Sequence, residues 1–314
     1  MTGEHLRIEV SNLTKRFGAV TAVEDLSFTV EQGMITGFLG PNGAGKTTTM
    51  RMIIGHVAPT SGTATIGGRR YGDIPCPSAT VGAVFDAAAF HPRHSARDHL
   101  LVYAAMGGYP ASRVAELLGL LGLAGAADRK TRGFSTGMRQ RLNLATALLG
   151  DPRVLLLDEP GNGLDPEGMS WLRSFLRHLA DEGRTILISS HALGEVQQIV
   201  DDVVVIRQGR LVASGRLSEL AGSAPPVLVR SPDAAVLART LMENPPEGVA
   251  APRVEPVQPG ELRVHGLDAP QIAELAAAHR LRVHGLVTEN ASLEQLFLDL
   301  TTSDLTVEER GSAR

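Results

Sequence analysis

A glycine-rich loop between an apolar segment and a helical segment constrains the fold of this chain more than any other feature. Residues 40–47 read GPNGAGKT and fit the pattern GxxxxGK[ST]. The apolar residues 34–39 are typical of a buried strand, and residues 46–55 are typical of a helix. Glycines let the backbone curl so that its N–H groups point at phosphate oxygens, and the start of the helix adds the positive end of its dipole. The loop therefore predicts a site for the phosphates of a nucleotide, with a glycine-rich turn that binds nothing as the alternative.

The side chains of the loop have distinct predicted roles. We expect Lys46 to reach the β and γ phosphates. We expect the Thr47 hydroxyl to bind Mg²⁺, since this small ion keeps most of its waters and takes only one or two protein oxygens. Thr48 is expected to support the α and β phosphates, and the nucleotide is also expected to contact Asn42, Gly43 and Gly45. Taken alone, the loop fits a GTPase or a kinase equally well.

Two acidic residues follow the apolar run VLLL at residues 154–157, so they lie at the carboxyl end of a predicted strand. Ligands usually bind at this end of the strands in an open parallel sheet. We expect Asp158 to hold Mg²⁺ through water, and Glu159, on the opposite side of the strand, to be the base that polarises the attacking water. A solvated strand end or a helix N-cap is the alternative for this pair alone. Its combination with the glycine-rich loop favours a site that hydrolyses a nucleotide.

Residues 134–141, FSTGMRQR, lie shortly before the acidic strand and resemble the signature LSGGQxQR of the ABC family, which no other class of P-loop protein carries. The resemblance covers residues 8–222, including GLDP at residues 163–166 and SSH at residues 189–191. It implies an α/β P-loop cassette with a mixed-sheet core, an antiparallel β subdomain and a helical subdomain. It also implies that the nucleotide is ATP, that Mg²⁺ accompanies it, and that the chain is an ATPase.

The resemblance assigns roles to five further residues. In the family, the positions of Ser135 and Gly137 face the γ-phosphate bound by a second copy, so two ATP molecules lie between two chains, and Asp165 belongs to the D-loop. The position of His191 contacts the γ-phosphate and the attacking water, and that of Phe17 stacks on adenine. From the residues alone, Ser135 can be a plain helix cap, a lone histidine is more often structural than catalytic, and Phe17 is as often a core residue as a stacking platform.

Four positions depart from the family pattern. Asp86 stands after residues 81–85 where the family has the Gln of the Q-loop. An aspartate can still reach Mg²⁺ through water, but it is shorter and adds negative charge near the phosphates, which disfavours nucleotide binding unless Mg²⁺ offsets it. We therefore expect Asp86 to be a metal-site residue that alters the affinity of the site for the nucleotide. Thr136, Met138 and Gly161 also differ from the family, and none of them removes an expected catalytic group.

The sequence pattern of the chain changes near residue 222. This change predicts a cassette over residues 1–222 and an accessory domain over residues 223–314. In the first region, antiparallel strands are expected at 7–13 and 26–30, and the apolar runs at 81–85, 154–157, 185–189 and 202–206 alternate with helical segments, as in a parallel sheet. The second region is expected to have strands at 227–230, 253–257, 261–265 and 281–287 and helices at 233–243, 270–279 and 292–300. This βαββαβ order predicts a small α+β ferredoxin-like domain.

Composition excludes several functions. The net charge of -4 and the pI near 6.2 give no general attraction to nucleic acid or anionic lipid, so no nucleic-acid partner is expected. Cys76 is the only cysteine, which excludes an internal disulfide and a cysteine-rich zinc site. The N-terminus has no secretory signal, and no stretch reaches the roughly 20 apolar residues that span a bilayer. We therefore do not expect the chain to cross a membrane itself.

Residues 81–100, with FSTGMRQR and the motif EPGNGLDPEG, are similar to ATPase subunits of bacterial exporters of the daunorubicin and bacitracin resistance type. The residues ASLEQLFL at 291–298 resemble their C-terminal extension. This likeness implies a homodimer, peripheral at the cytoplasmic face of the plasma membrane, that powers a separate ABC-2 type permease. The alternatives are a soluble ATP switch acting on ribosomes or DNA, and self-resistance by sequestering a small molecule. The accessory domain is open to regulatory, dimerising or capping roles.

Overall fold

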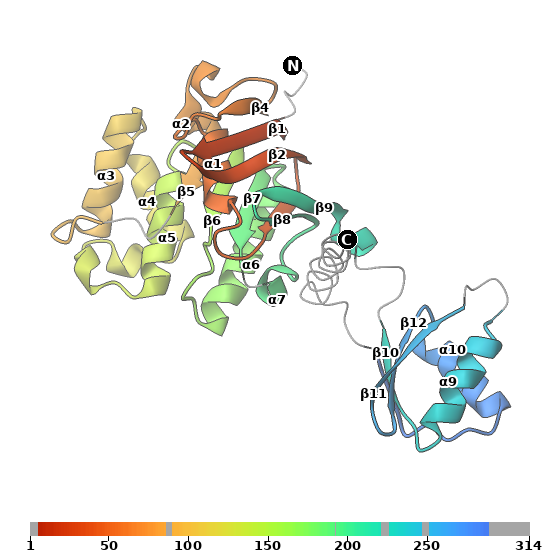
Figure 1. Cartoon of the computed structure of the whole chain (residues 1–314). Coiled ribbons are helices and arrows are strands. Elements are labelled where there is room, and N and C mark those ends of the chain that lie inside the picture. The colour runs from red at the N-terminus through yellow and green to blue at the C-terminus, as the bar shows by residue number, and fades with distance from the viewer. Residues whose placement is uncertain (1–5, 86–89, 192, 221–225, 247–250, 289–314) are drawn as a thin grey trace. The chain divides into compact units, whose positions relative to one another are not determined.

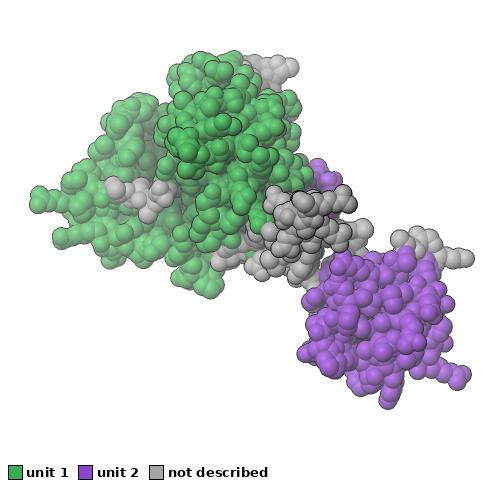
Figure 2. Space-filling view, in the orientation of Figure 1, with its two compact units in different colours: residues 1–215 green, residues 216–314 purple. Residues whose placement is uncertain are grey.

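The computed structural model describes residues 6–85, 90–191, 193–220, 226–246 and 251–288 (Figure 1). The chain divides into two units, Met1–Gly215 and Arg216–Arg314, shown in green and purple in Figure 2. Three predictions lie outside the described residues: the boundary after residue 222, the role of Asp86, and the helix at 292–300.

A six-stranded sheet forms the centre of the first unit, in the order β5-β6-β7-β3-β8-β9. Its strands are β3 (Ile35–Leu39), β5 (Val81–Val84), β6 (Val154–Asp158), β7 (Thr185–Ser190), β8 (Asp202–Arg207) and β9 (Arg210–Arg216). The first five strands of that order are paired in parallel, and every residue of β3, β6 and β7 is buried. Both faces of a parallel sheet are covered by other elements, so its strands are buried on both sides and consist of continuous apolar runs. The parallel sheet predicted from the sequence is confirmed, and it brings the carboxyl ends of β3, β6 and β7 to one edge.

A three-stranded antiparallel sheet in the order β2-β1-β4 packs beside this core. Its strands are β1 (Ile8–Phe17), β2 (Val20–Val30) and β4 (Ser61–Ile66). Ile8 lies opposite Val30 on β2 and opposite Ile66 on β4, and all three are buried. The same apolar core includes Phe38 of β3 and Met50 of α1 (Lys46–Ile53), the helix that follows the glycine-rich loop. The expected antiparallel β subdomain is therefore present.

In sequence, the longer helices of the first unit lie between β5 and β6 and directly after β6. The longer ones are α3 (Ala96–Gly107), α4 (Ser112–Leu120), α5 (Thr136–Ala147) and α6 (Pro166–Asp181). Short helices are α2 (Pro77–Thr80), α7 (Leu193–Val196) and α8 (Leu217–Leu220), and single 3-10 turns are η1 (Tyr71–Asp73), η2 (Ala124–Ala126) and η3 (Thr131–Gly133). A capping box begins α3, because the Ser95 hydroxyl accepts from Asp98 N and the Asp98 carboxylate accepts from Ser95 N. Helices α3, α4 and α5 contact one another and form the helical subdomain (Figure 1).

A buried histidine joins two helices of this subdomain. His99 of α3 is 6% exposed, and its Nε2 lies 3.1 Å from the Thr146 hydroxyl of α5. That hydroxyl donates to Leu142 O, so it accepts from an Nε2–H of His99. Burial, with a smaller effect of His94, lowers the pKa of His99 to about 4. The folded protein therefore keeps this ring neutral at pH 7.

We expect acidification to destabilise the first unit through His99. The pKa of His99 is about 4 in the folded state and 6.5 in an exposed ring, so the unfolded chain binds the extra proton as the pH falls below 6.5. The free energy of unfolding should fall by at most about 2 kcal/mol between pH 7 and pH 5 from this group. Urea unfolding of the wild type and of His99→Gln at both pH values measures the contribution. The same pH dependence in both proteins would contradict it.

In the described part of the second unit, a four-stranded antiparallel sheet in the order β11-β12-β10-β13 packs with helices α9 and α10. Its elements are β10 (Val227–Arg230), α9 (Ala234–Glu243), β11 (Arg253–Gln258), β12 (Glu261–His265), α10 (Ala269–Ala278) and β13 (Gly285–Thr288). Val229 and Val264 of the sheet pack with Leu237, Leu241 and Ile272 of the helices in one core. The predicted βαββαβ order is present.

The last strand of this unit is shorter than predicted, since it begins at Gly285 and not at residue 281. Leu281 N donates to Ala276 O at the end of α10, so this residue closes the helix. Arg282 donates from N, Nε and Nη2 to the Asp233 carboxylate, and its carbonyl accepts from the Ser231 hydroxyl. These bonds hold the backbone of Arg282 outside the sheet. Arg282 also holds the pKa of Asp233 at about 2.

Candidate functional site

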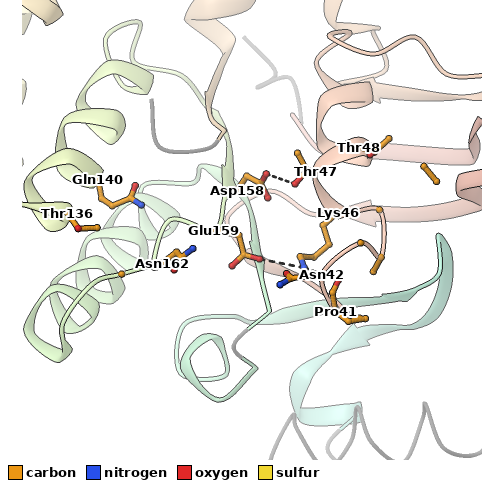
Figure 3. A pocket seen from close by; sticks show the side chains of 15 residues that line it. Pro41, Asn42, Lys46, Thr47, Thr48, Thr136, Gln140, Asp158, Glu159 and Asn162 are labelled. Atoms are coloured by element: carbon orange, nitrogen blue, oxygen red, sulfur yellow. Dashed lines mark hydrogen bonds and ion pairs between the residues drawn. The ribbon is translucent and has the colours of Figure 1, made fainter. Parts of the chain in front are cut away.

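The glycine-rich loop runs from the carboxyl end of β3 to the start of α1 and lines a cavity of about 520 Å³ (Figure 3). A Cβ at Gly40 would lie 2.4 Å from Ile206 O, so neighbouring backbone leaves no room for a side chain there. Gly45 has a φ of 105°, and a Cβ there would lie 2.6 Å from Ala22 O. Packing against β2 and β8 therefore requires glycine at both positions. The cavity is lined by Ala22, Thr136, Gln140, Asp158, Glu159, Asn162, Gly163 and residues 41–48.

Lys46 is the cation of this cavity, and its side chain is 6% exposed. Its Nζ donates to Gly40 O at 2.6 Å and to Pro41 O at 3.4 Å, and it lies 3.5 Å from Glu159 Oε1. Figure 3 shows the side chain between the loop and Glu159. The loop carbonyls therefore hold the ammonium group in place on the cavity wall, as a group that binds phosphate requires.

Asp158 is held by two hydroxyl groups and is 7% exposed. Thr47 Oγ1 donates to Asp158 Oδ2 at 2.6 Å, and Ser189 Oγ donates to Asp158 Oδ1 at 2.5 Å. A buried carboxylate beside a hydroxyl that keeps free lone pairs suits Mg²⁺, which takes few protein oxygens. The residues present thus fit this ion. In the described ranges, no group of three or more His, Cys, Asp or Glu side chains is placed to hold a metal.

Glu159 lies between Lys46 and His191. Its Oε2 is 2.9 Å from His191 Nδ1, and its backbone N–H donates to Ser189 Oγ at 3.0 Å. A φ of 50° places Glu159 in the left-handed region, which turns its side chain away from the line of the strand and into the cavity. A carboxylate in this position can accept a proton from a water molecule beside the glycine-rich loop. The structure brings His191 to Glu159, and the role of Glu159 as the base stays a prediction.

The predicted signature and D-loop residues cap helices. Ser135 is the N-cap of α5 and accepts from Met138 N at 3.3 Å, and Asp165 is the N-cap of α6 and accepts from Gly168 N at 2.7 Å. Both residues are exposed, and neither they nor Gly137 line the cavity. The capping alternative for Ser135 is therefore present in the fold. Their roles toward a second copy stay predictions.

Phe17 is 52% exposed at the end of β1, so it is not a core residue. Lys15 Nζ lies 4.8 Å from the centre of its ring. It is not among the residues that line the cavity, whereas Asn42, Gly43, Gly45 and Thr48 are. Stacking of Phe17 on adenine stays a prediction.

Three residues at the site lie in motifs recognised in the sequence but were given no role of their own: Ser189, Gln140 and Asn162. Gln140 and Asn162 line the cavity opposite the loop (Figure 3). Ser189 is fully buried and lies directly opposite Asp158 in the register of β6 and β7. A hydroxyl residue directly after the apolar run at residues 186–188, toward the carboxyl end of the predicted strand, was the available signal for Ser189.

Known proteins are similar to this chain in sequence and in fold. The ABC transporter family profile matches residues 23–162, and a domain family of unknown function (DUF8746) matches residues 225–294. The bacitracin transport ATP-binding protein BcrA of Enterococcus faecalis is 41% identical over 216 residues, covering 68% of this chain and 70% of that protein. The uncharacterized ABC transporter ATP-binding protein YhcH of Bacillus subtilis (strain 168) is 33% identical over 302 residues, covering 94% and 95%. A solved ATP-binding subunit of an ABC transporter superposes with a TM-score of 0.62 and 29% identity, covering 68% of this chain and 91% of that one.

Proposed function

This chain belongs to the ABC transporter family as an ATP-binding subunit and ATPase, and we propose that it powers export of a drug, antibiotic or similar compound through a separate ABC-2 type permease. The observation that carries the proposal is the placement of Glu159 between Lys46 and His191, in the cavity that the glycine-rich loop lines. The class of compound rests on relatives named for bacitracin transport and lantibiotic transport, and the direction of transport rests on relatives named for Nod factor export.

The loop residues are proposed to bind the phosphates of ATP. Residues 41–48 and the buried ammonium of Lys46 line the cavity, where backbone N–H groups of the loop would bind the phosphates. Thr47 and Asp158 would hold Mg²⁺, with Asp86 as a further expected contact. Bound Mg²⁺ would neutralise negative charge on the β and γ phosphates during transfer. Thr48 and Asn42 add polar groups on the same wall.

Glu159 is proposed to act as the base of hydrolysis. It accepts a proton as a water oxygen bonds to the γ-phosphorus and the bond from that phosphorus to the bridging oxygen breaks, releasing ADP and phosphate. His191 lies against the same carboxylate and is proposed to orient it and the water. Lys46, on the other carboxylate oxygen, stabilises charge on the leaving phosphate oxygens.

A second copy of the chain is proposed to complete the site. The α5 N-terminus with Ser135 and Gly137, and the exposed Asp165 before α6, are then directed to the ATP bound by the partner copy. Helix α5 has 12 residues, so its N-terminal N–H groups favour an anion. Phe17 is proposed to stack on adenine, which its exposure permits.

The place of action is proposed to be the cytoplasmic face of the plasma membrane, where the chain is peripheral and binds its permease. Within the described part of the chain, no helix has the length and apolar character to span a membrane. The relatives are named for transport, which favours this function over a switch on ribosomes or DNA.

We expect an affinity-tagged copy of this chain, recovered from detergent-solubilised membranes of its host, to carry an integral membrane protein with several long apolar helices. Mass spectrometry of the eluate measures this, with the same purification from cells that produce an untagged chain as the control. Recovery of ribosomes or DNA in place of a membrane protein would contradict the proposal.

A further inference from the structure

Ser189 is a fully buried hydroxyl residue near the carboxyl end of β7. It lies opposite Asp158 of β6 on one side and Phe38 of β3 on the other. Ser189 thus lies on an inner strand of the sheet. It is near the carboxyl ends of the strands, where the glycine-rich loop, the two acidic residues and His191 meet.

The Ser189 hydroxyl makes one bond to each residue of the acidic pair. It donates its proton to Asp158 Oδ1, and one of its two lone pairs accepts the backbone N–H of Glu159 at 3.0 Å. Asp158 Oδ2 is already bonded to Thr47. A continuous set of hydrogen bonds therefore runs from Thr47 of α1 through Asp158 and Ser189 to the backbone of Glu159.

The bond to Glu159 N has a conformational consequence. With a φ of 50°, Glu159 is a non-glycine residue in the left-handed region, which is costly and persists only where surrounding contacts hold it. The N–H bond to Ser189 is such a contact. The strand ends at Ser190, and the next residue is His191, whose ring meets the Glu159 carboxylate.

We propose that Ser189 is a positioning residue for ATP hydrolysis, whose hydroxyl orients the Asp158 carboxylate on the metal side and the Glu159 backbone on the water side. The proposal rests on the roles proposed above for Asp158 and Glu159. One hydroxyl thus bonds to both acidic residues. Loss of this hydroxyl is therefore expected to disturb the metal site and the base together.

The test measures ATP hydrolysis by the purified full chain against ATP and against Mg²⁺. Ser189→Ala is expected to lower kcat about 10- to 100-fold and to raise the Mg²⁺ concentration for half-maximal rate by about tenfold, because supporting hydrogen bonds of metal sites have effects of this size. The KM for ATP should stay within about threefold, since the loop and Lys46 are unchanged. Ser189→Thr keeps the hydroxyl and is expected to restore most of kcat, because Ser189 lines a small cavity of about 110 Å³ that can take the added methyl.

A matched control lies at the other end of the same strand. Thr185 is also fully buried, and its hydroxyl donates to Leu6 O, away from the acidic pair. Thr185→Val therefore removes a buried hydroxyl from β7 and should lower the melting temperature while leaving kcat and the Mg²⁺ dependence unchanged. If Ser189→Ala does not fold, Ser189→Cys keeps the size of the side chain with a weaker hydrogen-bonding group, and its kcat should lie below that of Ser189→Thr.

Three results would overturn the inference: an unchanged kcat and Mg²⁺ dependence in Ser189→Ala, the same loss of kcat in Thr185→Val, or no recovery in Ser189→Thr. Glu159→Gln in the same assay separates this failure from that of the proposed function. If Glu159→Gln retains full turnover, the proposed base is wrong. If Glu159→Gln loses turnover and Ser189→Ala does not, the role of Ser189 alone is wrong.

Discussion

Glu159→Gln is expected to lower the ATP hydrolysis rate of the purified chain by at least about 100-fold, while ATP binding changes by less than about threefold. The glutamine has the size of glutamate and keeps the backbone N–H bond to Ser189, so the turn after β6 should be preserved. Its amide cannot accept the proton of the attacking water. Phosphate release measures hydrolysis, and titration with a fluorescent ATP analogue measures binding.

The same variant is expected to accumulate a dimer with ATP, because the site proposed to be completed by a second copy would form and hydrolysis would not open it. Analytical ultracentrifugation with and without ATP checks this. Glu167→Gln, an exposed acid in the first turn of α6, is the matched control and should hydrolyse ATP at the wild-type rate. Wild-type turnover in Glu159→Gln would remove Glu159 from its proposed role.

The sequence predicts the parts of the site that follow from local pattern. A strand, a glycine-rich turn and a helix are contiguous at residues 34–55, so the position of Lys46 and Thr47 follows from the chain itself. Asp158 was predictable for a similar reason, because a four-residue apolar run before an acid marks the carboxyl end of a buried strand. Parallel pairing of β3, β6 and β7 then brings these separate ends to one edge.

The remaining features depend on tertiary register, which local pattern does not specify. Ser189 contacts Asp158 only because β6 and β7 pair with these two residues opposite each other, and a shift by one residue would turn Ser189 to the other face. The left-handed φ of Glu159 is imposed by contacts from β7, since glutamate has no preference for it. The start of β13 was wrong by four residues because Asp233, 49 positions away, binds Arg282.

Two residues with similar sequence surroundings can differ in side-chain exposure. Phe17 and Phe38 are both aromatic residues at or near a strand end, yet Phe17 is 52% exposed and Phe38 is fully buried against Phe28. Only the first is available to a ligand. The structure thus removes the core alternative for Phe17.

Lys46→Met is expected to lower kcat/KM for ATP by at least about 100-fold and, unlike Glu159→Gln, to weaken ATP binding as well. Methionine keeps the unbranched stem in its buried position but loses the ammonium group that Gly40 O and Pro41 O hold beside the phosphate-binding loop. No other cationic side chain lines this cavity among the described residues, so no neighbour can replace the charge. The same titration and phosphate-release assays measure both effects, with Lys130→Ala, at an exposed lysine, as the control. Because dimer accumulation needs bound ATP, Lys46→Met should stay monomeric under conditions that dimerise Glu159→Gln, and binding at the wild-type affinity would contradict the assignment of Lys46 to the phosphates.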